Sequence, residues 1–149
     1  MNATQALQTV QKLEQVTHIS TSGTVLQRIS TILSKVQLPQ MEKDQFLRRI
    51  ASELLPQVDE NNISTTIKKI VEDFLRSKHG HVFENCRRVL EAMGYALKSN
   101  KGSHFIFALP GEFDTMTIVK HSGDADASDV EKILERWKLL IRKAPPKTS

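Results

Sequence analysis

The sequence predicts an α+β protein in which a helical N-terminal region precedes an α-β-β-β-α domain with a three-stranded antiparallel sheet. Up to residue 78, apolar residues recur at the spacing of amphipathic helices. Between residues 95 and 121, three short runs bounded by turn residues have the character of strands. Helical spacing returns after residue 127. This order favours helices followed by a helix–sheet–helix domain.

The N-terminal region contains four stripes of apolar residues at helical spacing. Gly23, Pro39 and Pro56 separate the first three stripes and end the third, since proline lacks an amide donor and glycine is unfavourable inside a helix. The stripes comprise Ala6, Val10 and Leu13; Val25, Ile29, Ile32, Leu33 and Val36; Phe46, Leu47, Ile50 and Leu54; and Ile63, Ile67, Ile70, Val71 and Phe74. We expect a helical domain over residues 1–78.

A second domain is predicted over residues 79–143, because Gly80 interrupts the helical pattern and the sequence changes character after it. A helix over 82–93 ends at Gly94, and strands follow over 95–99, 103–109 and 115–121. The final helix has an apolar stripe made of Val130, Ile133, Leu134, Trp137 and Ile141. Residues 144–149 are predicted to form a disordered tail.

The composition excludes several classes of protein. No segment reaches the roughly 18 consecutive apolar residues of a membrane helix, and the first residues do not resemble a signal peptide, so we expect a cytoplasmic protein. The single cysteine, Cys86, excludes an intramolecular disulfide and a cysteine-based metal cage, and its helical spacing indicates a buried thiol. We expect neither a metal nor a cofactor.

The net charge of +4 permits nucleic-acid binding but does not argue strongly for it. Residues 1–78 carry ten Lys and Arg against eight Asp and Glu, and residues 79–149 carry eleven against nine. The positive charge is therefore spread over both parts of the chain. Asp124, Asp126 and Asp129 precede the final helix, where carboxylates stabilise the positive end of the helix dipole.

Alternation along the strands predicts which side chains face the core. In the second strand, Phe105 and Phe107 fall on one face and His104 on the other. In the third strand, Met116 belongs with the core and His121 with the opposite face. Two helices can cover one face of a three-stranded sheet and leave the other open. We therefore expect both histidines on the open face.

These residues resemble the pattern of the HicA family of small RNA-cleaving toxins. The matching features are the helix ending in Met93-Gly94-Tyr95, then Lys101-Gly102-Ser103-His104, and then Thr117-Ile118-Val119-Lys120-His121 before a helix. The resemblance covers residues 79–142 and implies a double-stranded-RNA-binding-domain-like fold. It also implies RNA cleavage by the histidine of the Gly-Ser-His element, which is His104 here. The helical region 1–78 departs from the family, whose members are close in length to the C-terminal segment alone.

The expected function is that of a metal-independent endoribonuclease, an mRNA interferase toxin that cuts single-stranded or messenger RNA. RNA carries its own nucleophile, the 2′-hydroxyl, so cleavage requires proton transfer, for which histidine is suited. His104 is the candidate catalytic residue in a general acid or base role. The candidate RNA-binding or assisting residues are Gly102, Ser103, Lys101, Lys98, Lys120 and His121.

The resemblance also implies a partner, an antitoxin of the HicB type that covers the active face. The alternative function is a non-catalytic RNA-binding or adaptor module whose helical domain binds a partner. The apolar stripes of residues 1–78 can be buried against each other, against the C-terminal domain or against a second copy of the chain.

Overall fold

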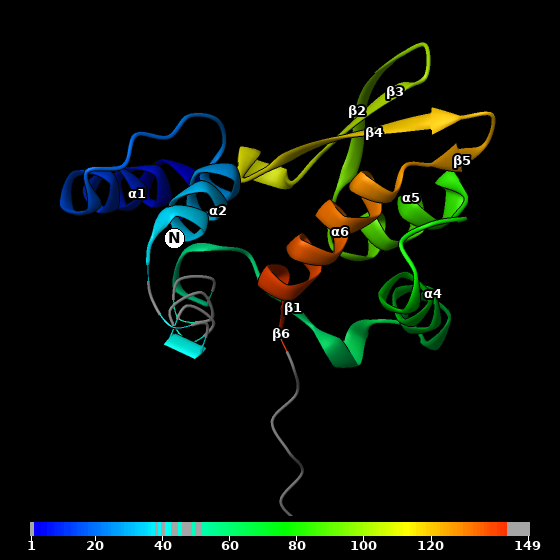
Figure 1. Cartoon of the computed structure of the whole chain (residues 1–149), viewed down its shortest axis with the longest axis horizontal. Helices are drawn as coiled ribbons and strands as arrows, with labels where there is room; N and C mark the ends of the chain where they lie inside the picture. The colour runs from blue at the N-terminus through cyan, green and yellow to red at the C-terminus, as the bar shows by residue number, and fades with distance from the viewer. Residues whose placement is uncertain are drawn as a thin grey trace, which may run out of the picture. The chain divides into compact units, whose positions relative to one another are not determined.

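The structure is a computed structural model of the whole chain, and it describes residues 2–37, 39, 41, 42, 45, 49 and 52–142 (Figure 1). The predicted stripe residues Phe46, Leu47 and Ile50 and the predicted tail 144–149 lie outside the described residues. The chain forms two compact units. The first comprises residues 1–56 and Leu109–Thr115, and the second comprises Gln57–Ala108 and residues 116–149.

In the first unit, the two predicted helices are confirmed as α1 (Ala3–Thr17) and α2 (Val25–Lys35), which pack against each other. A capping box between Asn2 and Gln5 begins α1, satisfying amides that have no partner inside the helix. The buried residues of the two helices include Ala6, Val10, Val25, Leu26, Ile29, Ile32 and Leu33. An ion pair between Glu14 and Arg28, both largely buried, adds a polar contact between α1 and α2.

The first unit also contains the connection between the second and third predicted strands, Leu109–Thr115. This segment includes the 3₁₀ turn η2 (Pro110–Glu112) and is bonded to the N-terminal end of α2. The Leu26 N–H donates to the Phe113 carbonyl at 3.0 Å, and the Thr24 hydroxyl donates to the Asp114 carboxylate at 3.1 Å. Residues more than eighty positions apart therefore build one unit.

The second unit contains α4 (Thr65–Arg76), α5 (Phe83–Ala92) and α6 (Ala127–Leu140). Its antiparallel sheet has four strands in the order β2 (Ala96–Lys101), β3 (His104–Ala108), β4 (Thr115–His121) and β5 (Asp124–Ala125). Two further short strands, β1 (Val58–Asp59) and β6 (Ile141–Arg142), pair in parallel.

The expectation of three antiparallel strands was wrong because it missed β5. Ser122 and Gly123 both take positive φ angles, 50° and 98°, which close a two-residue hairpin between β4 and β5. The hairpin pairs His121 with Asp124 and Lys120 with Ala125. A strand of two residues is too short to produce a visible alternation of polar and apolar residues in the sequence.

The predicted boundary at residue 78 falls inside the second unit. Helix α4 packs against α5 and α6, with Ile70, Val71 and Phe74 buried. The Phe74 ring also contacts the His81 ring, with centroids 4.7 Å apart. The contacts of α4 therefore place it with the sheet-containing unit rather than with α1 and α2.

The core of the second unit lies between the sheet and the helices α5 and α6, which lie on one side of it (Figure 1). The Phe83 ring of α5 lies 4.6 Å from the Phe105 ring and 6.3 Å from the Phe107 ring, between centroids. Met116 of β4 is buried, as its alternation predicted, and Ile118, two residues further along the strand, is buried as well. The sheet face turned toward Phe83 is therefore the core face.

The final helix and the cysteine follow their predictions in part. Val130, Ile133 and Leu134 are buried, whereas Trp137 is only half-buried and Ile141 lies beyond the helix, paired with Val58. Cys86 is fully buried, as predicted. Among the helices of the described residues, none is both long and apolar enough to cross a membrane.

Candidate active site on the open sheet face

We call the sheet face directed away from Phe83 the open face, and four residues form a row across it. Lys101 on β2 is paired with His104 on β3. The Lys120 N–H donates to the Ser103 carbonyl at 2.8 Å, so Ser103 lies opposite Lys120. In an antiparallel pair the next residue of β3, His104, then lies opposite the preceding residue of β4, Val119. Because Lys120 pairs with Ala125, Asp126 follows beside Val119. The cross-strand row is therefore Lys101, His104, Val119 and Asp126.

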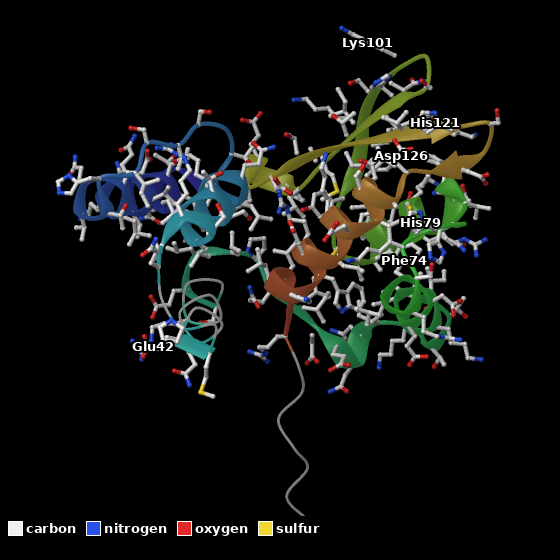
Figure 2. All side chains as sticks on the ribbon, viewed as in Figure 1. Glu42, Phe74, His79, Lys101, His121 and Asp126 are labelled. Atoms are coloured by element: carbon white, nitrogen blue, oxygen red, sulfur yellow. The ribbon has the colours of Figure 1, made fainter. Side chains whose placement is uncertain are left out.

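The β2–β3 hairpin places Lys101 and His104 next to each other. Its two-residue turn is Gly102-Ser103, with φ of +57° at Gly102 and no positive φ at Ser103, the pattern of a type II′ turn. A side chain with a Cβ is strained at such an angle, which explains the glycine. Open space surrounds the position that a Cβ would occupy on Gly102, so the backbone of the turn is accessible to a ligand. Figure 2 shows Lys101 at the tip of this hairpin.

His104 is exposed at the start of β3, as its alternation predicted. The Ser103 hydroxyl lies 3.5 Å from His104 Nδ1, the longest separation at which the two can share a hydrogen bond. Within the described residues, no carboxylate forms an ion pair with His104. His104 therefore presents its imidazole to solvent beside a lysine and a hydroxyl.

His121 ends β4 and contacts a carboxylate that follows β5. Its Nε2 lies 3.0 Å from Oδ1 and 3.1 Å from Oδ2 of Asp126. The side chains are 58% and 46% exposed, so both remain accessible to a substrate. Figure 2 shows the two residues near the β4–β5 end of the sheet.

Asp126 is the functional candidate that sequence reasoning assigned to another role. It is the residue that precedes α6, as expected of a helix-capping carboxylate, but its side chain makes no capping hydrogen bond. It binds His121 instead, because the β4–β5 hairpin brings position 126 back beside the end of β4. The signal in the sequence was His121 and Asp126 on either side of Ser122-Gly123, and it becomes informative only once β5 is recognised.

Asp129 fixes the start of α6 to the sheet. The residue is 4% exposed, and its carboxylate accepts a hydrogen bond from the Val119 N–H at 3.0 Å. The Lys120 N–H points toward β3, and neighbouring amides along a strand point in opposite directions, so the Val119 N–H points toward the other edge of β4. At that edge β5 pairs only with Lys120 and His121, so it does not reach Val119. The Asp129 carboxylate therefore takes the place of a strand at this edge of the sheet.

The structure brings together five of the predicted site residues and separates two. Lys101, Gly102, Ser103, His104 and His121 lie at one end of the sheet, around the cross-strand row. Lys98 lies at the irregularity in β2 between Leu97 and Ser99. The Lys120 ammonium lies 5.5 Å from the centroid of the Phe83 ring, so it belongs to the core face and not to the open face.

Arg87 of α5 is engaged on its own helix. Arg87 forms ion pairs with Glu84 and with Glu91, the second at 2.6 Å. The hydrogen bonds from Arg87 lower the pKa of Glu84, and both glutamates raise the pKa of Arg87. These pairs neutralise the Arg87 charge locally.

The arrangement can exchange protons through two imidazoles and bind an anion through the Lys101 ammonium and the exposed hairpin backbone. The described residues contain no group of three His, Cys, Asp or Glu side chains placed to hold a metal ion. His81, the neighbour of Gly80, is engaged with the Ser77 carbonyl and the Phe74 ring.

Comparisons of the chain with protein-family models, with curated proteins and with solved structures found no match.

Proposed function

We propose that this chain is a metal-independent endoribonuclease that cuts single-stranded or messenger RNA, with His104 as the residue that transfers the proton of the 2′-hydroxyl. The observation that carries the proposal is the exposed imidazole of His104 paired across the hairpin with Lys101, on the open face and beside the turn at Gly102. A proton-transfer group and a cation are thereby placed side by side on one accessible surface.

The chemistry of RNA matches this small set of groups. The 2′-hydroxyl attacks the adjacent phosphorus once its proton is removed, so the enzyme needs no nucleophile of its own. Imidazole ordinarily titrates near neutral pH and can accept or donate a proton under physiological conditions. One well-placed general acid or base is worth roughly 10²–10⁴-fold in rate. Such an acceleration is within reach of an exposed site without a metal.

Phosphate binding is supported by the hairpin. The Lys101 ammonium provides a positive charge at the position paired with His104. The absence of a side chain at Gly102, together with the open space around it, lets a phosphate approach the backbone closely. The Ser103 hydroxyl is exposed beside them and can donate a hydrogen bond to a phosphate oxygen.

The family resemblance of residues 79–142 extends the proposal to biology. It suggests an mRNA interferase toxin of a toxin–antitoxin system, acting in the cytoplasm. An antitoxin of the HicB type would then silence it by covering the open face. The helix, sheet and helix in the second unit have the order that the resemblance implies, with α4, β1, β5 and β6 in addition. These biological roles follow from the resemblance, whereas the choice of His104 follows also from its position on the open face.

The test compares the wild-type chain with His104→Ala on an end-labelled single-stranded RNA in the presence of EDTA. His79→Ala is the matched control, because His79 is also an exposed histidine of the second unit but lies before α5, outside the open face. We expect cleavage by the wild type and by His79→Ala and its loss in His104→Ala. Equal RNA binding without cleavage by all three proteins would instead identify a non-catalytic RNA-binding module.

A further inference from the structure

We propose that His121, oriented by Asp126, is a second catalytic residue, which donates the proton that the leaving 5′-oxygen of the RNA requires. This inference rests on the proposed function and deepens it, since it assigns the two proton transfers of one cleavage reaction to two histidines. It arises from the contact between His121 and Asp126 and from their position relative to His104.

The two histidines lie on the same face at the same end of neighbouring strands. The hydrogen bond from the Lys120 N–H to the Ser103 carbonyl sets His104 beside Val119, so His121 is the diagonal neighbour of His104. Diagonal neighbours across strands are about 7–8 Å apart, somewhat less between their Cβ atoms. A phosphodiester can lie between two side chains at this separation, with one imidazole on each side of the phosphorus.

Asp126 acts as a positioning residue for His121. Its carboxylate accepts a hydrogen bond from the Nε2–H of His121, which orients the ring and leaves Nδ1 as the nitrogen that exchanges a proton with a substrate. The carboxylate is itself fixed in place, because Asp126 precedes α6 and Asp129 ties the first turn of that helix to β4. The usual role of a carboxylate at this position, capping the helix, is not fulfilled by Asp126.

The proposed step balances with RNA as the only reactant. The bond between the 2′-oxygen and phosphorus forms, and the 2′-hydroxyl proton passes to neutral His104. The bond between phosphorus and the 5′-oxygen breaks, and the 5′-oxygen takes the Nδ1 proton of protonated His121. The products are a 2′,3′-cyclic phosphate end and a 5′-hydroxyl end. Exchange with solvent returns both exposed histidines to their starting protonation states.

The charged groups around His121 come from each neighbouring element. Asp126 contacts the ring, and Asp124 of β5 is its partner in the strand register. His104 of β3 is its diagonal neighbour, and Lys101 of β2 lies beyond His104 in the cross-strand row. Lys120, although adjacent in sequence, lies on the core face over Phe83. Asp124→Asn is thus a control for the loss of a nearby charge without the loss of the contact with Nε2.

The experiment uses the full chain and two RNA dinucleotides, one natural and one with sulfur in place of the bridging 5′-oxygen. A thiolate is a far weaker base than an alkoxide and leaves without a proton donor, since thiols titrate near pH 8.5. We expect His121→Ala to cleave the natural substrate about 10²–10⁴-fold more slowly than the wild type and the sulfur substrate at close to the wild-type rate. His104→Ala should be slow on both.

The role of Asp126 is tested with the same two substrates. Asp126→Ala should slow cleavage of the natural substrate, because the His121 ring is no longer oriented, and should leave cleavage of the sulfur substrate close to the wild-type rate. Asp126→Glu should restore the rate on the natural substrate in part, and Asp124→Asn should cleave both substrates at close to the wild-type rate. A purely structural role for Asp126 would instead lower the rate on both substrates equally.

The outcomes separate the two proposals. If the wild type cleaves neither RNA, or if His104→Ala cleaves as the wild type does, the proposed function fails and this inference fails with it. If His104→Ala is inactive but His121→Ala cleaves both substrates at the wild-type rate, only the role of His121 is overturned. Equal loss by His121→Ala on both substrates would also overturn it. Far-UV circular dichroism of each variant, and the conservative variant His121→Gln, check that a loss of cleavage is not a loss of folding.

Discussion

The buried carboxylate of Asp129 accepts a hydrogen bond from the Val119 N–H at the open edge of β4, where β5 has already ended. Asp129→Ala should destabilise the second unit by about 1–3 kcal/mol, because it leaves a backbone amide without a partner. Asp129→Asn should cost less, since the amide oxygen can still accept the bond. Urea unfolding followed by circular dichroism measures both free energies. Lys132→Ala is the control, because it removes only the ion pair between the exposed Lys132 ammonium and the Asp129 carboxylate, 3.8 Å apart, and leaves the hydrogen bond to Val119 in place.

The thiol of Cys86 should be chemically inert in the folded protein. Burial, and secondarily the charge of Asp129, raises the pKa of Cys86 to about 12. The thiolate is the reactive form, so we expect no reaction with a thiol reagent at pH 8 until urea unfolds the chain. Rapid labelling of the native protein at that pH would contradict the burial of this side chain.

The raised pKa of Cys86 also predicts how the free energy of unfolding depends on pH. A thiol in the unfolded chain titrates near pH 8.5, whereas the folded protein keeps the Cys86 proton until about pH 12. Between these values the unfolded state binds fewer protons, so the free energy of unfolding should fall as the pH rises. Cys86→Ala should show a weaker dependence over this range in urea titrations. An unchanged slope would contradict the assignment to Cys86.

The glycine of the β2–β3 turn should matter for both stability and activity. Gly102→Ala places a Cβ at φ of +57°, which costs roughly 1–2 kcal/mol, and it narrows the approach to the hairpin backbone. Gly80→Ala is a matched control, because Gly80 has φ of +78° and equally open surroundings. We expect similar losses of thermal stability for the two variants, with a further loss of RNA cleavage only for Gly102→Ala.

Helix α4 should be required for stable folding of the sheet-containing unit. A fragment beginning at residue 79 lacks the buried side chains of Ile70, Val71 and Phe74. Burial of each such side chain is worth about 1.5–3 kcal/mol, so this fragment should be several kcal/mol less stable than one beginning at residue 57. Thermal unfolding of the two fragments tests the boundary. Equal stabilities would place the boundary at residue 78, as the sequence predicted.

Much of the fold could be predicted from local sequence rules. The stripes of α1, α2 and α4, the third strand over 115–121 and the inward orientation of Phe105 and Phe107 all follow from the periodicity of apolar residues. The candidate residue His104 also follows from alternation, which requires it to lie on the face opposite its phenylalanine neighbours. These features depend on residues only a few positions apart, and the local pattern is sufficient to predict them.

Other features depend on contacts between distant residues, and only the tertiary structure decides them. No local pattern could show that α4 packs with α5 and α6, or that Thr24 binds Asp114 ninety positions away. Lys120 has the sequence character of a phosphate-binding lysine, yet its ammonium lies 5.5 Å from the centroid of the Phe83 ring, on the core face.

The sequence by itself determined the turn at residues 102–103 and the sheet face on which His104 lies, through turn chemistry and strand alternation. The pairing of His121 with Asp126 was decided by the tertiary structure, through a two-residue strand that folds the chain back on β4. The physical reason is that a carboxylate before a helix can cap that helix or bind a neighbouring side chain. The choice depends on what the rest of the fold brings within hydrogen-bond distance.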